Sequence, residues 1–142
     1  MTEGRVLGVD PGERRVGLAL SDPLGIIASP LSVLDRGAPN LIDQLGAIIA
    51  DNDVASVVIG LPVSLDGTEG PAARAARDLG REVREQVGCD VTFFDERFTT
   101  VQAEAALLEG GVTRAGRKAA RDKVAAALIL QGFLDSHGRD DL

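Results

Sequence analysis

Apolar residues recur along the chain with two different spacings, and the change from one to the other divides it into strands and helices. Short or alternating apolar runs bounded by turn residues are typical of strands, whereas apolar residues three and four apart are typical of helices. These patterns predict strands at residues 6–9, 16–22, 26–34, 55–60 and 91–95. They predict helices at about residues 41–49, 71–87, 100–109 and 117–134, which gives the order βββαβαβαα.

The order of these elements predicts the sheet. The first three strands follow one another without a helix, so we expect an antiparallel meander. Pro30 cannot donate a backbone hydrogen bond, which places the third strand at an edge or a bulge of the sheet. The last two strands are reached through helices, and right-handed crossovers make such strands parallel. The sequence therefore predicts an α/β fold with a mixed five-stranded sheet, three antiparallel strands and then two parallel ones, flanked by helices.

The composition narrows the class of protein. Of 142 residues 44% are apolar, which is ample for one core, and no repeat or long linker interrupts the chain. We expect a single domain over residues 1–137 and a polar tail over 138–142. No apolar run approaches the roughly 20 residues of a membrane helix, and the N-terminus lacks the apolar core of a signal peptide. A soluble, cytoplasmic protein is therefore expected.

Cysteine and histidine occur once each, at Cys89 and His137. One cysteine excludes a disulfide or a thiolate metal cluster within the chain, and Cys89 fits a structural thiol. His137 lies in a polar segment near the end of the chain, so we do not expect a catalytic Ser/His or Cys/His pair. Hydrolytic chemistry in this protein would depend on carboxylates and metal ions.

The first candidate carboxylate, Asp10, stands where a buried strand ends. Strand side chains alternate between faces, so Asp10 shares a face with Val6 and Gly8, and Gly8 lacks a side chain that would crowd the acid. Asp10-Pro11-Gly12 is also a common turn sequence, and a plain hairpin turn is the alternative. Asp10 becomes informative if other acids lie near it.

Two further acids occupy unusual positions. Glu96 directly follows the fifth strand and precedes a helix for which Thr99 is a suitable N-cap. The amides at the start of that helix would favour a phosphate. Asp122 shares a helix face with Ala126 and Ile129, where a lone buried carboxylate is costly. The alternatives are a solvent-facing loop acid for Glu96 and, for Asp122, a salt bridge to a neighbouring basic residue.

Convergence of Asp10, Glu96 and Asp122 would require a cation. Three close carboxylates repel one another unless a divalent ion compensates their charge. Hard carboxylate oxygens select Mg²⁺ or Mn²⁺. Such ions activate water and stabilise the oxygens of a phosphodiester without histidine, so metal-dependent phosphodiester hydrolysis is our hypothesis.

A set of short motifs follows one order along nearly the whole chain. They are Gly8-Val9-Asp10-Pro11-Gly12, Arg15-Val16-Gly17-Leu18-Ala19, Ser21-Asp22, Gly60-Leu61-Pro62 with Gly67 and Gly70, Asp95-Glu96-Arg97 with Thr99-Thr100, and Asp122 followed by Ala125-Ala126 and Ile129-Leu130-Gln131. Together they resemble the YqgF/RuvX family of RNase H-like nucleases, with Arg14-Arg15 and Phe98 where relatives usually carry Lys-Arg and Leu. The resemblance implies an RNase H-like fold and catalytic, metal-binding roles for Asp10, Glu96 and Asp122.

The resemblance also implies a substrate. Members of the family are described as nucleases in 5′-end maturation of precursor 16S ribosomal RNA, and many were earlier named Holliday junction resolvase homologues. Metal-assisted cleavage needs only a phosphodiester, so the residues alone leave both substrates open. The resemblance favours an endonuclease of pre-16S rRNA in ribosome biogenesis, with junction resolution in DNA recombination and repair as the alternative. A homodimer would fit the symmetry of a junction but is not required for RNA.

Basic residues gather near Asp122 although the chain carries a net charge of −7. Residues 112–123 hold five basic side chains and one acid, a local charge of +4, which suits contact with phosphates. A solvated run of charge is the alternative. We expect nucleic-acid contacts from Arg14, Arg15, Arg97, Thr99, Thr100, Arg114, Arg117, Lys118 and Arg121.

Two other segments are expected to have different roles. The arginines of residues 71–87 alternate with acids and predict a solvent face with salt bridges. The glycine-rich loop 60–67 lacks the Gly-Lys-Ser/Thr ending of a P-loop and is expected to shape one wall of the site. An ATP-binding module is a competing class. Sugar kinases and actin-like ATPases close two such domains around the nucleotide, whereas a single domain is expected in this chain. A noncatalytic binding protein is the third class, and the three acids argue against it.

Overall fold

The computed structural model describes residues 4–98 and 114–137, and within them the side chains other than those of residues 98, 114–122 and 137. The strands are β1 (Arg5–Pro11), β2 (Arg15–Ser21), β3 (Ala28–Asp35), β4 (Val54–Leu61) and β5 (Asp90–Asp95). The helices are α1 (Leu41–Asp51), α2 (Pro71–Val87), the short 3-10 helix η1 (Glu96–Phe98) and α4 (Arg114–His137). The helix predicted at about 100–109 lies outside the described residues, and α4 begins three residues before its predicted start at 117.

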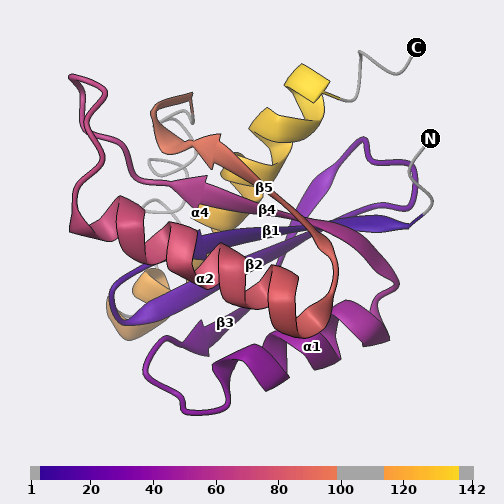
Figure 1. Ribbon diagram of the computed structural model, residues 1–142. Coiled ribbons are helices and arrows are strands. Elements are labelled where there is room, and N and C mark those ends of the chain that lie inside the picture. The colour runs from indigo at the N-terminus through magenta and orange to yellow at the C-terminus, as the bar shows by residue number, and fades with distance from the viewer. Residues whose placement is uncertain (1–3, 99–113, 138–142) are drawn as a thin grey trace.

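The strands form one sheet in the order β3-β2-β1-β4-β5 (Figure 1). β1 pairs with β2, and β2 with β3, in antiparallel fashion, whereas β4 is parallel to both β1 and β5. The mixed sheet predicted from the order of the elements is therefore confirmed. β3 is an edge strand, and its pairing with β2 shifts register beside Pro30, as the proline predicted.

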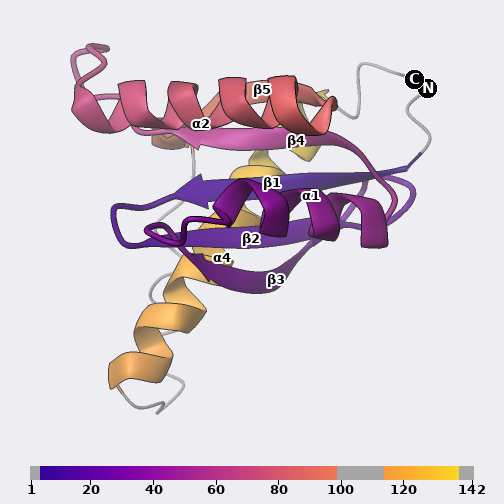
Figure 2. The same ribbon diagram turned by 60° about the horizontal axis from the view of Figure 1, so that its bottom comes forward.

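Helices cover both faces of the sheet, as Figures 1 and 2 show, with α1 and α2 on one face and α4 on the other. The core under α1 and α2 is made of aliphatic side chains, including Leu7, Val9, Leu45, Ile59, Leu79 and Val83. Among the described side chains, the core under α4 joins Val6, Ala19, Val58 and Phe94 to Ala126, Ile129, Leu130 and Leu134. None of the described helices is long and apolar enough to cross a membrane.

Helix α2 shows how local sequence sets the ends of an element. It begins at Pro71, whose fixed φ suits the first turn, and ends before Gly88, which takes a left-handed φ of 84°. Its arginines face solvent, where Arg77 pairs with Glu69 and Arg81 with Asp78. The predicted solvent face with salt bridges is therefore present in α2.

Candidate active site

The carboxyl ends of three parallel strands meet at one edge of the sheet. Asp10 is the penultimate residue of β1, Gly60 is the penultimate residue of β4, and Glu96 directly follows β5. Side chains two residues apart on a strand share a face, so these positions continue the rows of Val6, Val58 and Phe94 in the core under α4. Asp10 and Glu96 therefore lie on the α4 face of the sheet.

The carboxyl groups of Asp10 and Glu96 are joined by a hydrogen bond. Glu96 is half-buried. Burial, followed by the negative charge of Asp10, the hydrogen bond itself and the charge of Asp95, raises the pKa of Glu96 from 4.5 to about 8. A protonated Glu96 thus donates to the Asp10 carboxylate, and the proton removes the repulsion that two ionised acids would have at this spot.

Gly60 provides the space in which Glu96 lies. A Cβ atom at Gly60 would stand 2.8 Å from Oε1 of Glu96 and 2.5 Å from Cδ1 of Ile129 on α4. A side chain at this place would therefore displace the ends of the Glu96 and Ile129 side chains. The sequence interpretation gave the glycine-rich segment a role in the wall of the site but missed this particular contact. The signal available was a glycine that interrupts the apolar run of β4 on the face of Val58.

Gly8 has a different role from the one its sequence suggested. A Cβ atom there would stand 2.7 Å from Cβ of Leu130 and 3.0 Å from the carbonyl oxygen of Ala126. The missing side chain therefore admits helix α4, where we had expected it to spare room around Asp10. The close approach of α4 to β1 nonetheless serves the site, because it fixes where the helix runs past Asp10.

The course of α4 indicates where position 122 lies. Gln131 is hydrogen-bonded to Ile26 and Ala28, at the end of the sheet opposite Asp10, and Ala126 lies over Gly8 in the middle. One turn before Ala126, the helix therefore carries position 122 toward the Asp10 end. The side chain of Asp122 is outside the described ones, and the described side chains include no group of three His, Cys, Asp or Glu residues that could hold a metal.

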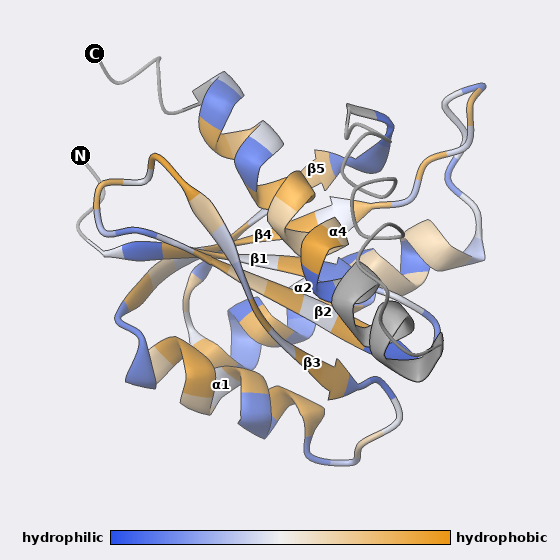
Figure 3. Cartoon of the chain, turned by 180° about the vertical axis from the view of Figure 1, so that it is seen from behind, coloured by the Kyte–Doolittle hydropathy of each residue, from blue (hydrophilic) through white to orange (hydrophobic). Residues whose placement is uncertain are grey.

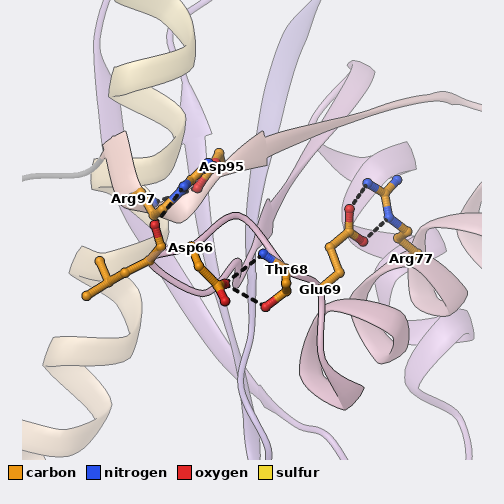
Figure 4. Close-up of polar contacts among 7 residues, drawn as sticks. Asp66, Thr68, Glu69, Arg77, Asp95 and Arg97 are labelled. Carbon is orange, nitrogen blue, oxygen red and sulfur yellow. Dashed lines mark hydrogen bonds and ion pairs between the residues drawn. The ribbon is translucent and has the colours of Figure 1, made fainter.

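Arg97 contacts both Asp95 and the loop between β4 and α2 (Figure 4). Its Nε and Nη2 donate to Oδ2 of Asp95 at 2.8 and 2.6 Å, and its Nη1 donates to the carbonyl oxygen of Leu65 at 3.5 Å. The hydrogen bonds that Asp95 accepts from Arg97, together with the charge of Arg97, hold the pKa of Asp95 below its usual range. The loop between β4 and α2 thus lies beside η1, which agrees with its expected place in the wall of the site.

The other predicted contact residues are only partly described. Arg14 is exposed in the turn after Asp10, and Arg15, the first residue of β2, is half-buried. Nη1 of Arg36 donates to the Gly12 carbonyl of that turn at 3.0 Å. Arg36 was missed because nothing in its sequence neighbourhood indicates this contact. Thr99 and Thr100 lie outside the described residues, and so do the side chains of Arg114, Arg117, Lys118 and Arg121. Their contacts with nucleic acid remain predictions.

The order of the strands and the placement of the two acids define an RNase H-like α/β protein. A family model described as "RuvX: Holliday junction resolvase" matches residues 4–136, and the chain belongs to this family of nucleases. A Lactococcus lactis protein named "Putative pre-16S rRNA nuclease" is 44% identical, covering 94% of this chain and 95% of the relative. A Dictyoglomus thermophilum protein of the same name is 42% identical, with 96% and 99% covered.

A solved structure shares the fold at much lower identity. The structure described as T. thermophilus RuvC in complex with Holliday junction substrate matches 94% of this chain and 96% of its own, with a TM-score of 0.54 and 16% identity. Identity this low shows a shared fold alone. The nuclease class of the chain therefore rests on its family and its close relatives.

Proposed function

We propose that this protein is a divalent-metal-dependent endonuclease that hydrolyses phosphodiester bonds during 5′-end maturation of pre-16S rRNA. The observation that carries the proposal is the hydrogen-bonded pair of Asp10 and Glu96 at the carboxyl ends of β1 and β5. The names of relatives more than 40% identical support the substrate. Asp10, Glu96 and Asp122 are the proposed catalytic residues.

The donor set fits Mg²⁺ or Mn²⁺. Two half-buried carboxyl groups that need a shared proton to coexist would bind a hard divalent cation in place of that proton. Asp10 and Glu96, with Asp122 from α4, are the proposed ligands. When bound, the ion would lower the pKa of a water and stabilise charge on the phosphate oxygens.

Neighbouring residues of the chain position the two acids. Gly60 leaves the space for the Glu96 carboxyl group, and Arg36 holds the turn that follows Asp10. We propose that Arg14, Arg15 and the basic start of α4 hold the phosphate backbone on either side of the acids, because these are cationic segments of an acidic protein. Binding should therefore weaken steeply as salt is raised.

Holliday junction resolution is the second candidate, and the description of the matching family model favours it. RNA and DNA substrates would present the same phosphodiester to the carboxylates. They differ in the 2′-hydroxyl and in the shape of the strands, which residues away from the acids would read. A direct comparison of substrates separates the two candidates.

The test incubates the purified protein with precursor 16S rRNA, single-stranded RNA and four-way-junction DNA, in Mg²⁺, in Mn²⁺ and in EDTA. Asp10→Asn is the active-site variant and Asp51→Asn, at the exposed end of α1, is the matched control. We expect metal-dependent cleavage of the precursor at its 5′ side by the wild type and Asp51→Asn but not by Asp10→Asn. Cleavage of the junction alone would favour the second candidate, and no metal-dependent cleavage of any substrate would overturn the proposal.

A further inference from the structure

The loop between β4 and α2, residues 62–70, presents an apolar side chain to solvent at the edge of the site. Leu65 is 95% exposed. The other large apolar side chains that are well exposed among the described residues, Leu24, Ile26 and Ile27, lie in the β2–β3 loop at the opposite end of the sheet. Within the described part of the chain, Leu65 is thus the exposed large apolar residue at the end that carries Asp10 and Glu96.

The tip of this loop is a hydrogen-bonded turn. The Ser64 amide donates to the Thr68 carbonyl at 3.0 Å, and the Gly67 amide donates to the Ser64 carbonyl at 2.8 Å. Oδ1 of Asp66 accepts from both the amide and the hydroxyl of Thr68 (Figure 4). Gly67 takes a φ of 88°, which favours glycine. The turn therefore holds its shape without help from Leu65.

The loop is also anchored on both of its sides. Glu69 forms two hydrogen bonds with Arg77 of α2, at 2.6 and 2.8 Å, and the Arg77 guanidinium lies 5.0 Å from the centre of the Phe93 ring. On the other side, Arg97 donates to the Leu65 carbonyl. Since Arg97 directly follows Glu96, the backbone of Leu65 lies close to the residue next to a proposed catalytic acid.

The charges around Leu65 indicate what it can contact. The side-chain charges of Asp66, Asp95 and Arg97 sum to −1, so this surface favours a base over a phosphate group. The nucleic-acid contact predicted for Arg97 stays a prediction, and it would be of this kind. The exposed leucine offers an uncharged apolar surface. In nucleic-acid complexes such side chains pack against base faces or insert between bases, and the faces become available where bases are unpaired or unstacked.

We propose that Leu65 packs against a nucleobase beside the scissile phosphate, and that the enzyme consequently requires an unstacked base at that position. The preferred substrate is then a single-stranded segment, or the boundary between a duplex and a single strand, rather than a continuous duplex. This inference rests on the proposed nucleic-acid substrate but not on the identity of the RNA. Leu65 acts in binding and specificity and takes no part in the chemical step.

The test measures binding separately from cleavage. RNA oligonucleotides carry one 2-aminopurine, either in a single-stranded segment or inside a duplex, and bind to Asp10→Asn protein in Mg²⁺. In the Asp10→Asn protein, the further substitution Leu65→Ala should weaken binding of the unpaired oligonucleotide about tenfold and remove the fluorescence change of 2-aminopurine. Leu65→Met should retain both, and Leu24→Ala, at the opposite end of the sheet, should match the parent.

In the otherwise wild-type enzyme, Leu65→Ala should raise KM about tenfold and change kcat less than about twofold. Three results would overturn the inference. They are equal binding by Leu65→Ala and Leu24→Ala, a loss of binding by Leu65→Ala on continuous duplex as large as on the unpaired oligonucleotide, and no binding of any oligonucleotide by the parent. If Leu65 affects binding but the wild type cleaves nothing, the proposed function fails while this inference stands. If the wild type cleaves and Leu65→Ala leaves KM and binding unchanged, the inference fails alone.

Discussion

The two faces of the sheet are packed with different kinds of side chain. Under α1 and α2 lie large aliphatic residues, and Leu7, Leu45 and Ile59 are almost fully buried there. Under α4, which Figure 3 shows crossing the sheet, Gly8 and Gly60 lie against the helix. On the second face the two glycines leave room for helix α4 and for the Glu96 carboxyl group. The difference predicts that stability and activity can be changed separately.

The largest expected effect is on activity, from the α4 face. Glu96→Gln keeps the size of the side chain but removes the charge that a metal ion would require. We expect cleavage to fall by about 10³-fold or more, a barrier increase of roughly 4 kcal/mol. The melting temperature in EDTA at pH 8 should stay level or rise, because the raised pKa of Glu96 shows that ionisation is unfavourable there. Glu85→Gln, on the exposed side of α2, is the matched control for kcat/KM and thermal unfolding.

The next effect is on stability, from the other face. Leu45 of α1 is 1% exposed, and Leu45→Ala should lower the free energy of unfolding by about 2–5 kcal/mol. Cleavage per folded molecule, measured well below the melting temperature, should stay near the wild-type level. Leu65→Ala, which removes the same atoms from an exposed position, should change the free energy of unfolding by less than about 0.5 kcal/mol. Loss of cleavage by folded Leu45→Ala would show that the two faces are not separable.

Glycines on the two faces give a sharper contrast. A Cβ at Gly60 would meet Glu96 and Ile129, so Gly60→Ala should displace the carboxyl group and lower cleavage by about 10²-fold. It should also cost about 1–3 kcal/mol of stability through overpacking. At Gly46 in α1 the new Cβ would lie 3.6 Å from Val87, an ordinary contact. Gly46→Ala should therefore stabilise by about 0.5–1 kcal/mol and leave cleavage unchanged. Equal activity of the two variants in a kinetic assay would contradict the role of Gly60.

The sequence predicted the sheet better than it predicted the packing around the site. Alternation of apolar residues and the position of Pro30 determine strands and edges locally, and the mixed topology followed from them. Asp10 and Glu96 could be brought to one edge because parallel strands end together. The reasons for Gly8 and Gly60 depend on which helix crosses which strand, and sequence spacing does not contain that information. Arg36 reaches Gly12 across 24 positions, which no local pattern indicates.

The smallest expected effect is the pH dependence of stability without metal. In the folded protein the pKa of Glu96 is raised to about 8 by burial and by Asp10, whereas in the unfolded chain Glu96 ionises near 4.5. Between these values the folded state binds more protons, so its stability decreases as pH rises. The stabilisation is complete below about pH 4.5 and is lost as pH passes through about 8.

Thermal unfolding in EDTA measures this loss directly. From pH 5.5 to pH 8.5 the free energy of unfolding of the wild type should fall by at least about 1 kcal/mol more than that of Glu96→Gln, which corresponds to a difference in Tm of roughly 3–5 °C. Leu45→Ala should keep the wild-type pH dependence at a lower Tm, because its face holds no such acid pair. Mg²⁺ or Mn²⁺ at pH 8.5 should raise the Tm of the wild type but not that of Glu96→Gln, since a cation bound to the folded state replaces the lost proton. Parallel profiles of Tm against pH for the wild type and Glu96→Gln would contradict the proton shared by Glu96 and Asp10. They would also contradict the view that the α4 face differs from the other face by holding this pair of acids.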